Sequence, residues 1–404
     1  MERQILHVDV NNAFLSWTAV EKLKNGEEID IRNIPSVIGG DEQKRSGIVL
    51  AKSMKAKECG VVTGETLYQA RKKCPNLQVF SSEFKVYRKY SNLLYNLLLE
   101  YTDKIERYSI DECFLDMTNF LINSTLLEKA KEISKRVKEE LGFTVNIGVA
   151  HNKLLAKMAS DFEKPDKIHT LFENEIESKM WALPVKELFM LGRKTAPKLY
   201  NMRIKTIGDL AKADKTILIK LFGKHGNMMW EYANGIDTTP VKYIKEDPKS
   251  IGNSVTLPRD IYKIEELNEI LLTLAEQVSY RLRKYNMVAT TVSVQLRTKD
   301  FEDYSHQKKL STTTSNTKEI YTKSKELLQE MYKNQKPIRL VGLRVDGLIK
   351  KDELQISLFD NNNNKKQDKL DSVIDNLNEK YGYNSITRAG KLNIEEIVKM
   401  NPKL

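Results

Sequence analysis

Cysteine is scarce in this chain, and its few cysteines form no recognisable disulfide or metal pattern. Cys59, Cys74 and Cys113 are odd in number, scattered along 404 residues and without a CxxC pair. Neither a disulfide framework nor a zinc cluster is therefore indicated, and a reducing cytosol fits this cysteine content. The five histidines also lack metal-ligand spacing. They are left without a role here: His7, His151, His169, His225 and His306.

Long hydrophobic runs are absent as well. Residues 1–4 lead into a short apolar stretch that lacks the hydrophobic region of a signal peptide. No stretch approaches the roughly 20 apolar residues that a membrane-spanning helix needs. We therefore expect a cytoplasmic protein that has no membrane partner.

Hydrophobic and charged residues are both plentiful. They make up 40% and 30% of the chain, which is typical of a globular protein and excludes wholesale disorder. Because single cores rarely grow past about 250–300 residues, a chain of 404 residues predicts two to four domains. The formal net charge of +11 favours a polyanionic partner, since neutralised phosphates release their counterions. We find no internal repeat.

The first 150 residues alternate predicted strands and helices. The helices show apolar residues at helical spacing, and the strands are short runs of β-forming residues. In chain order the elements are a strand at 5–10, a helix at 14–23, a helix at 87–101, a strand pair within 105–117, a helix at 126–141 and a strand at 143–150. This order predicts a split βαβ sheet, in which helices cover one face and the other face stays free for a substrate.

The rest of the chain changes character several times. Residues 36–80 contain repeated glycines and predict a small inserted lobe. Beyond Lys164-Pro165 the chain becomes helical and basic, whereas residues 251–358 alternate helical and β-rich runs and predict an α+β domain. The polar stretch after Phe359 is expected to be loosely attached.

Three acidic residues are candidates for a metal site. Asp9 ends the first predicted strand, and Asp111 and Glu112 lie about 100 residues later. Converging carboxylates, with the carbonyl of Val10, can hold the pair of Mg²⁺ ions that phosphoryl transfer uses. Adjacent residues of a regular strand point to opposite faces, so the chain must bend at a hairpin tip near Ser109 for the pair to share a site. An isolated Asp-Glu pair would instead be a polar turn.

Three segments, in order, resemble signatures of the bacterial Y-family translesion DNA polymerases. They are residues 5–14, residues 108–116 and residues 146–161 followed by Lys164-Pro165. The resemblance covers roughly residues 3–350. It implies an α+β multidomain fold shaped as a right hand, with a ferredoxin-like palm, small fingers, a helical thumb and an α+β little-finger domain that binds DNA. The implied divisions are palm, 1–35 and 76–165; fingers, 36–75; thumb, 166–240; linker, 241–250; little finger, 251–358; and a polar tail, 359–404.

The resemblance also implies roles for single residues. Asp9, Asp111 and Glu112 become catalytic metal ligands, joined by the carbonyl of Val10. The ions are two Mg²⁺, with Mn²⁺ as a substitute. Phe14 becomes a steric gate whose ring would clash with a ribose 2′-hydroxyl; without the motif it would be read as a core phenylalanine.

The fingers depart from the family pattern. Many members carry a tyrosine and an arginine three residues apart that hold the triphosphate, whereas this chain has Met54 and Lys57. Lys57 keeps the positive charge but not the planar fork of arginine, and Met54 has no hydroxyl. Lys164 matches the family lysine near the triphosphate, although a Lys-Pro pair alone is more often a loop.

Two further segments point to DNA and to a protein partner. Residues 189–196 resemble a helix-hairpin-helix in which Gly192, Lys194 and Thr195 would contact a DNA phosphate, although Met190 replaces the usual first glycine. Residues 355–359 resemble the pentapeptide with which bacterial polymerases bind the sliding clamp, through Gln355, Leu358 and Phe359. The alternative for residues 189–196 is a plain helical turn, and the alternative for residues 355–359 is an ordinary edge strand.

The sequence therefore indicates a template-directed, low-fidelity DNA polymerase that acts in translesion synthesis. Its expected partners are primed DNA, deoxynucleoside triphosphates and the sliding clamp, and we expect a monomer. One alternative is a catalytically inactive protein that binds DNA and the clamp. A cyclase-like nucleotidyltransferase is a second, because residues 39–42 resemble the cyclase signature, but Gln43 and the later segments disfavour it.

Overall fold

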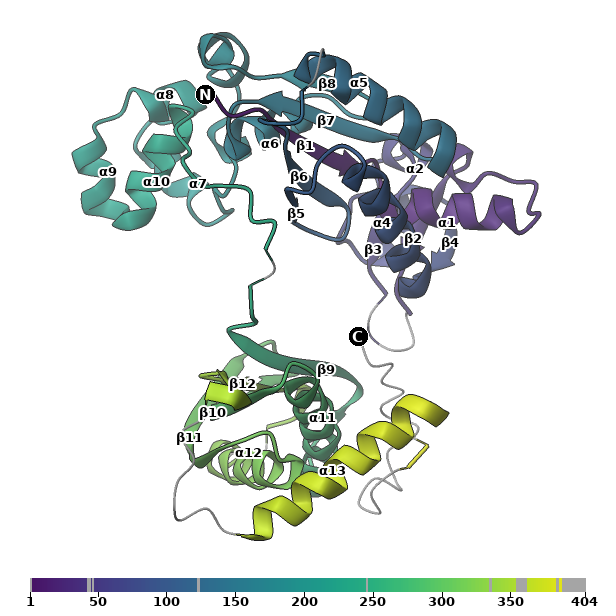
Figure 1. Ribbon diagram of the computed structural model, residues 1–404, viewed down its shortest axis with the longest axis vertical. Helices are drawn as coiled ribbons and strands as arrows, with labels where there is room; N and C mark the ends of the chain where they lie inside the picture. Colours follow the sequence, from purple (N-terminus) through teal and green to yellow (C-terminus); the bar gives the residue numbers. More distant parts are fainter. Residues whose placement is uncertain are drawn as a thin grey trace. The chain divides into compact units, whose positions relative to one another are not determined.

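The chain forms two compact units, which are described separately. One unit comprises residues 1–40 and 48–245, and the other comprises residues 41–47 and 246–404 (Figure 1). No helix in the described part of the chain has both the length and the apolar character needed to span a membrane. The structure is a computed structural model that describes residues 2–41, 45, 47–121, 124–244, 246–333, 336–353, 362–382 and 385–386.

A five-stranded sheet forms the centre of the first unit, in the order β5-β6-β1-β7-β8 (Figure 1). β1 is antiparallel to both β6 and β7, as a split βαβ sheet requires. The fifth strand, β8, pairs parallel with β7 although it lies in the segment predicted as thumb. The strands are β1 Ile5–Val10, β5 Ile105–Arg107, β6 Glu112–Asp116, β7 Val145–Ala150 and β8 Ile168–Thr170.

Three helices cover one face of this sheet and enclose a large core. They are α1 Ala13–Lys24, α4 Phe84–Leu99 and α5 Leu126–Arg136. Alternate residues of β1, namely Leu6, Val8 and Val10, enter this core. A capping box of Thr125 and Glu128 begins α5, which continues as one wider turn to residue 141. Helices on one face of the sheet were predicted from the sequence, and this prediction is confirmed.

The second face of the sheet is not wholly free, which corrects the expectation that it would be open to a substrate. Helix α6, Lys153–Asp161, packs on β1 and β7 there and shares a core with Ile5 and Phe114. The approach is very close, because a Cβ added to Gly148 would lie 1.8 Å from the carbonyl oxygen of Ala156. Only glycine fits at that position of β7.

A small lobe is inserted between α1 and α4. Its sheet has the order β3-β2-β4, and its own core lies between that sheet and two short helices. β4 pairs parallel with β2, so the lobe extends to residue 81, beyond the predicted boundary at 75. The elements are β2 Ser36–Gly39, β3 Val49–Lys52, α2 Met54–Glu58, α3 Leu67–Lys73 and β4 Gln78–Ser81.

Short helices follow the sheet, as the sequence predicts for residues 166–240. They pack around a core that continues from α6. Beyond them the chain is extended, and the backbone N–H of Lys242 donates a hydrogen bond of 2.6 Å to Glu106. The helices are α7 Ala196–Asn201, α8 Ile207–Ala211, α9 Lys215–Phe222 and α10 Lys224–Ala233.

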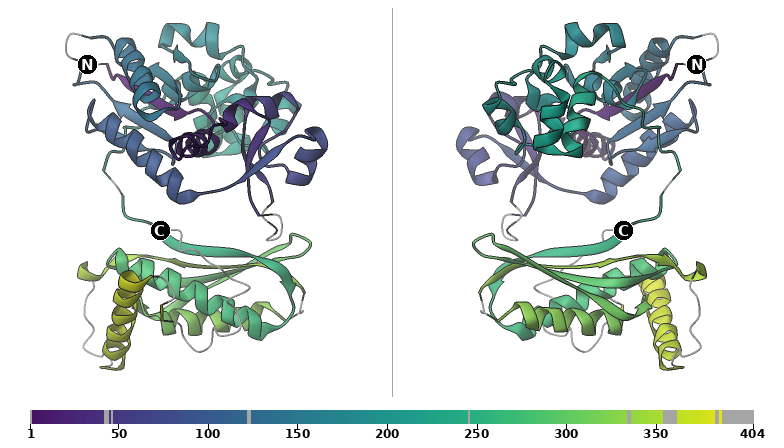
Figure 2. Two further views of the ribbon diagram at one scale, coloured as in Figure 1. Left: turned by 90° about the vertical axis from the view of Figure 1, so that its right-hand side faces the viewer. Right: turned by 90° about the vertical axis from the view of Figure 1, so that its left-hand side faces the viewer.

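The second unit is an α+β domain. Its long antiparallel strands have the order β11-β10-β12-β9, with β13 paired to β10. Both views in Figure 2 show its two central helices on one side of the sheet, over the core. The elements are β9 Ser250–Ile261, α11 Ile264–Lys284, β10 Met287–Thr298, β11 Asp303–Thr314, α12 Thr317–Met331, β12 Ile338–Asp346 and β13 Ile349–Lys350.

A further helix, α13 Asn362–Tyr381, lies in the segment expected to be a loosely attached tail. Arg283 of α11 holds it by ion pairs to Asp375 at 2.5 Å and to the buried Asp371 at 3.4 Å. Tyr280 adds a hydrogen bond of 2.8 Å to Glu379. The expectation of loose attachment is therefore wrong for this helix, because ion pairs about 90 residues apart in the chain hold it.

Candidate active site

Two predicted metal ligands face each other across neighbouring strands. Asp9 of β1 is directly opposite Glu112 of β6, and the Asp9 side chain is buried. Asp111 lies in the loop before β6, where the Ser109 hydroxyl donates a hydrogen bond of 2.6 Å to its carboxylate. The backbone N–H of Val10 bonds the carbonyl of Asp111 at 3.1 Å. The chain thus bends at residues 109–111, directly before Glu112, which agrees with the bend expected near Ser109.

Two lysines lie among these carboxylates. Lys157 of α6 is 8% exposed, and its Nζ lies 3.7 Å from Asp9, 3.4 Å from Glu112 and 3.2 Å from Asp161. Lys164 contacts Asp9 at 2.5 Å and Asp161 at 2.8 Å. Lys164 was predicted as a nucleotide-binding residue, whereas Lys157 had no predicted role. Its signal in the sequence is the helical spacing of Lys157 and Asp161, one turn apart on α6.

A buried histidine completes this cluster. His7 of β1 is fully buried, with its Nδ1 at 2.8 Å from the Ser160 hydroxyl and its Nε2 at 3.3 Å from Glu112. Burial lowers the pKa of His7, although the contact with Glu112 opposes the shift. Because its pKa is lowered, the imidazole of His7 is uncharged at neutral pH. Sequence reasoning left this histidine unassigned because no metal-ligand spacing includes it.

The pKa values of the adjacent Asp111 and Glu112 carboxyl groups shift in opposite directions. Burial alone would raise the pKa of Glu112, but the contacts with His7 and Lys157 outweigh it and lower the pKa to about 2. Burial raises the pKa of Asp111, and the nearby negative charges of Asp9 and Glu112 add to this rise. Burial opposes the charge of Lys164, yet Asp9 and Asp161 raise its pKa above the usual value. Glu112 is therefore ionised throughout the neutral range.

The ligand atoms of the predicted triad do not cluster tightly. Within the part of the chain that the structure describes, one group of three His, Cys, Asp or Glu side chains brings its ligand atoms within 4.8 Å of one another. That group is Glu2, His151 and Glu173, not the predicted carboxylates. The carboxylates of Asp9 and Glu112 instead contact lysine ammonium groups, so charge neutralisation at this site comes from the protein's own side chains.

Phe14, the predicted steric gate, belongs to an aromatic cluster. Its ring stacks on Tyr87 of α4 with a centroid distance of 4.4 Å and an interplanar angle of 17°. The Phe84 and Trp17 rings lie 6.1 Å and 6.3 Å away. Phe14 is only partly buried, so it is both fixed by its neighbours and accessible at the start of α1.

The two residues discussed for the predicted fingers, Met54 and Lys57, lie on α2 of the small lobe. Ser53 caps this helix by accepting a hydrogen bond from the backbone N–H of Ala56. Met54 and Lys57 are both exposed, at the first turn and the last turn of the helix respectively. The exposed Lys57 can offer a charge to a ligand, but its side chain offers no bidentate fork.

The segment predicted as thumb contains a tight turn before α7. The backbone N–H of Thr195 donates a hydrogen bond of 2.9 Å to the carbonyl of Gly192, and Gly192 has open space at its Cα. Lys194 lies within the turn and is exposed. Met190 has φ +65°, in the left-handed region that favours glycine. This explains why the resembling motif carries glycine at that position.

Replacing Met190 with glycine is expected to leave the protein at least as stable, while Met190→Ile is expected to lower the free energy of unfolding by about 1 kcal/mol or more. A left-handed conformation costs an L-residue about 1–2 kcal/mol, and a β-branched residue suffers most. Met190 is 56% exposed, so lost packing contributes little. Urea denaturation of both variants measures the difference, and equal midpoints would contradict the explanation.

The predicted clamp-binding residues, Gln355, Leu358 and Phe359, lie outside the described residues. The structure therefore does not test them. The preceding strand, β13, and the following helix, α13, both belong to the second unit.

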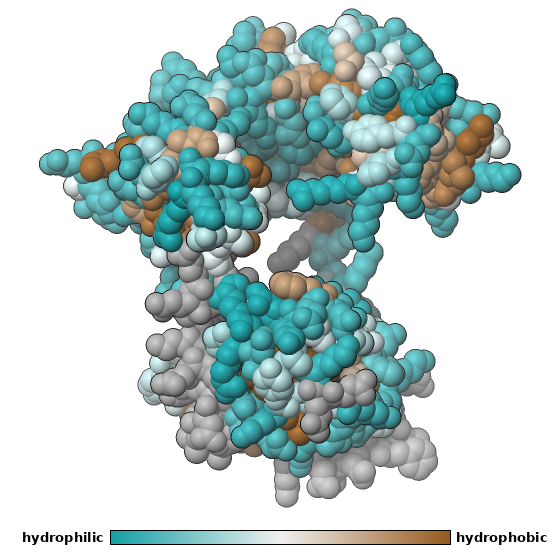
Figure 3. All heavy atoms as spheres, turned by 180° about the vertical axis from the view of Figure 1, so that it is seen from behind, coloured by the Kyte–Doolittle hydropathy of each residue, from teal (hydrophilic) through white to brown (hydrophobic). Residues whose placement is uncertain are grey.

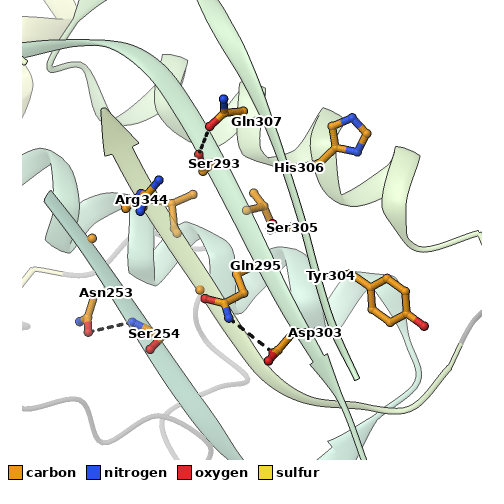
Figure 4. A pocket seen from close by; sticks show the side chains of 14 residues that line it. Asn253, Ser254, Ser293, Gln295, Asp303, Tyr304, Ser305, His306, Gln307 and Arg344 are labelled. Carbon is orange, nitrogen blue, oxygen red and sulfur yellow. Dashed lines mark hydrogen bonds between the residues drawn. The ribbon is translucent and has the colours of Figure 1, made fainter. Parts of the chain in front are cut away.

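The sheet of the second unit has a hollowed polar face (Figure 4). Along β10, Ser293 and Gln295 point to this face while the intervening Val294 is buried in the core. Ser293 donates to Gln307 at 3.3 Å, and Arg344 of β12 lies nearby. Among the residues that Figure 3 colours by hydropathy, hydrophilic ones predominate on both units. Such a face is suited to polar ligands.

Comparison with known proteins agrees with this fold. A family model described as the impB/mucB/samB family matches residues 8–161, and the model of its C-terminal domain matches residues 248–358. The chain is 52% identical to a DNA polymerase IV of Clostridium acetobutylicum, covering 98% of this chain and 100% of that protein. It is 40% identical to a DNA polymerase IV of Acetivibrio thermocellus, covering 96% and 97% respectively.

The fold is also similar to that of a solved structure. A chimeric Y-family DNA polymerase aligns with a TM-score of 0.75 and 24% identity, covering 86% of this chain and 99% of that one. Together, fold and relatives define a DNA-directed DNA polymerase with the right-hand architecture. The chain belongs to the impB/mucB/samB family, and is thus a bacterial member of the Y family of DNA polymerases.

Proposed function

We propose that this polymerase extends primers across damaged template bases with low fidelity, using a pair of divalent metal ions at Asp9, Asp111 and Glu112. The observation that carries the proposal is the pairing of Asp9 and Glu112 across β1 and β6, beside a bend that presents Asp111. Primer extension on a template with a defined lesion tests it. A failure to insert opposite the lesion, with normal extension on intact DNA, would restrict the function to undamaged templates.

The residues at the site fit divalent magnesium. The donor set is three carboxylates plus the backbone carbonyl of Val10, and Mg²⁺ prefers such oxygen ligands. Glu112 also has a buried carboxylate oxygen without a hydrogen-bond donor, although His7 and Lys157 lie within ion-pair distance. Bound there, two Mg²⁺ or Mn²⁺ ions would activate the primer 3′-hydroxyl and neutralise the leaving pyrophosphate.

The protein's own residues prepare the site in two ways. Lys157 keeps the carboxylates of the buried Asp9 and the partly buried Glu112 close together in spite of their mutual repulsion. Lys164 reaches the same Asp9 carboxylate but is 39% exposed at its side chain. It can therefore turn to an incoming triphosphate, where Lys57 of the small lobe supplies a second positive charge.

The stacked ring of Phe14 supports its role as a steric gate. Phe14→Ala is expected to raise the efficiency of ribonucleotide insertion, relative to deoxynucleotide insertion, by on the order of 100-fold. The reason is that the ring, fixed against Tyr87, would no longer occupy the space that a 2′-hydroxyl needs. Single-nucleotide insertion kinetics with matched ribo- and deoxynucleotides measure the ratio.

The matched control for this gate is Phe14→Tyr, which keeps a ring stacked on Tyr87 and should keep the discrimination. Thermal unfolding of both variants separates a local effect from lost packing. A ratio that stays unchanged in Phe14→Ala would assign Phe14 to the core alone.

Two surfaces are proposed to hold DNA. The turn around Gly192, Lys194 and Thr195 offers backbone N–H groups and a positive side chain to a phosphate. The polar sheet face of the second unit, with Arg344 among its side chains, offers hydrogen-bond donors to the backbone of a duplex. Because such contacts release counterions, binding should weaken steeply as salt rises.

The sliding clamp is proposed as a partner through Gln355, Leu358 and Phe359, with the protein itself a monomer in the cytoplasm. These assignments rest on the sequence. The alternative, an inactive protein that binds DNA and the clamp, is disfavoured because all three carboxylates are present. Because no exonuclease-like segment is recognisable in the sequence, we propose that this polymerase copies its template inaccurately. A misincorporation assay measures its error rate.

A further inference from the structure

Two of the three cysteines meet in the small lobe, although they are scattered in the sequence. The thiol of Cys74 donates to the Cys59 sulfur across 3.1 Å. Cys59 directly follows α2, and Cys74 directly follows α3, so the contact joins the ends of the two helices. A disulfide bond is about 2.0 Å long, so closing it would require an approach of only about 1 Å.

The surrounding backbone holds the two cysteines in place. The Cys59 N–H donates to the carbonyl of Lys55, and the Cys74 N–H donates to that of Ala70. Gly60, with φ +82°, turns the chain after Cys59, and Lys73 donates a hydrogen bond of 3.1 Å to the Gly60 carbonyl. The contact between the sulfurs is therefore part of an ordered turn.

The two thiols differ in access. Cys59 is exposed, whereas Cys74 is 2% exposed and belongs to the core of the lobe. Burial, reinforced by the neighbouring Cys59, raises the pKa of Cys74 to about 11. Because Cys59 is exposed and Cys74 is buried, an oxidant dissolved in water reaches the Cys59 thiol first. Cys74 is then the thiol that reacts with the oxidised Cys59.

A metal site is a poorer explanation for this pair. Thiolate metal sites in proteins usually have four ligands. Among the residues that the structure describes, no third His, Cys, Asp or Glu joins Cys59 and Cys74 in a group with close ligand atoms. Cys59 and Cys74 are instead a pair of neighbouring thiols that can be oxidised to a disulfide.

We propose that Cys59 and Cys74 form a reversible disulfide in response to peroxides. The Cys59 thiolate attacks hydrogen peroxide, the O–O bond breaks, and a sulfenic acid forms with release of hydroxide. The Cys74 sulfur then attacks the Cys59 sulfur, its proton neutralises the departing oxygen, and water leaves as the S–S bond forms. Two thiols and one peroxide give one disulfide and two waters, and a thiol reductant reverses the change.

The disulfide would act on the fingers, and this consequence rests on the proposed function. Lys57, the proposed triphosphate contact, lies on α2 two residues before Cys59. Drawing the end of α2 toward α3 displaces Lys57 from its ligand, while the carboxylates on β1 and β6 belong to a different sheet. Oxidation should therefore raise KM for the nucleotide and leave kcat unchanged.

The test is to treat the reduced full-length protein with hydrogen peroxide and count its thiols. We expect the number of thiols to fall from three to one, with a mass loss of about 2 Da and a peptide that links residues 59 and 74. Dithiothreitol should restore all three. Cys113→Ser, which removes the buried cysteine of β6, should still lose two thiols.

Single variants show whether the pair acts together. Cys74→Ser should stop at a sulfenic acid on Cys59 that dimedone traps, and Cys59→Ser should keep the thiol of Cys74. Oxidation of Cys59 beyond the sulfenic acid in the native chain, with Cys74 still a free thiol, would overturn the proposal. These readouts need no polymerase activity, so a failure of the proposed function would leave them intact. A disulfide that forms without changing KM would overturn only the consequence for the nucleotide.

Discussion

Primer extension is expected to fall by at least about 10³-fold when either Asp111→Asn or Glu112→Gln is introduced. Each change removes one negative charge and one strong oxygen ligand from the proposed metal site, and each keeps the side-chain volume. Loss of about 4 kcal/mol of transition-state stabilisation corresponds to this factor. Steady-state extension of a labelled primer, with Mg²⁺ and deoxynucleotides, measures it.

The matched control for this experiment is Glu106→Gln. Glu106 is a carboxylate of the neighbouring strand β5, where it pairs with Lys153 at 2.7 Å and with no proposed ligand. Its variant should keep extension within a few-fold of the native rate, and DNA affinity should be equal in the native chain and all three variants. If neither the native chain nor Glu106→Gln extends a primer, even with a clamp supplied, the inactive binding protein becomes the better description.

Elements with strong local signals were predictable from the sequence. The helix that begins at Leu126 has a capping box, an apolar face and a terminal Gly142 with φ +82°. β1 is a run of β-forming residues followed by a turn, and the structure places it at residues 5–10 as expected. Such signals depend on neighbours within one or two turns, so they do not need the tertiary structure.

Features that depend on distant contacts were not predictable. β8 has three residues and exists because it pairs with β7, and α13 is held by Arg283, which lies about 90 residues earlier. The contact between Cys59 and Cys74 likewise depends on how α2 and α3 pack. In each case the sequence is locally unremarkable, and the stabilising partner comes from elsewhere in the chain.

The strand positions of the proposed metal ligands Asp9 and Glu112 were predictable, but their surroundings were not. The period of two along β1 sends Leu6, Val8 and Val10 into one core, so His7 and Asp9 must lie on the opposite face. That face is the one that α6 covers, which is why a lysine of α6 reaches Asp9. The positions of β1 residues follow from the sequence, whereas the packing of α6 on that face does not.

Lys157→Met is expected to lower the free energy of unfolding by about 3 kcal/mol in the presence of EDTA. Lys157 is 8% exposed and lies within 4 Å of Asp9 and Glu112, so methionine would keep its volume but leave the buried Asp9 and the partly buried Glu112 without this cation. Removal of one partner from a buried ion pair costs about 3–5 kcal/mol. Urea denaturation at neutral pH measures the loss.

Two controls separate charge from packing in this prediction. Lys135→Met removes a lysine that is 73% exposed and should change stability by less than about 0.5 kcal/mol. Adding Glu112→Gln to Lys157→Met should recover part of the loss, because one of the uncompensated charges is then gone. Mg²⁺ should also stabilise Lys157→Met more than the native chain, since the ions would replace the missing cation. A loss in Lys157→Met that is no larger than in Lys135→Met would mean that Lys157 does not hold the carboxylates together.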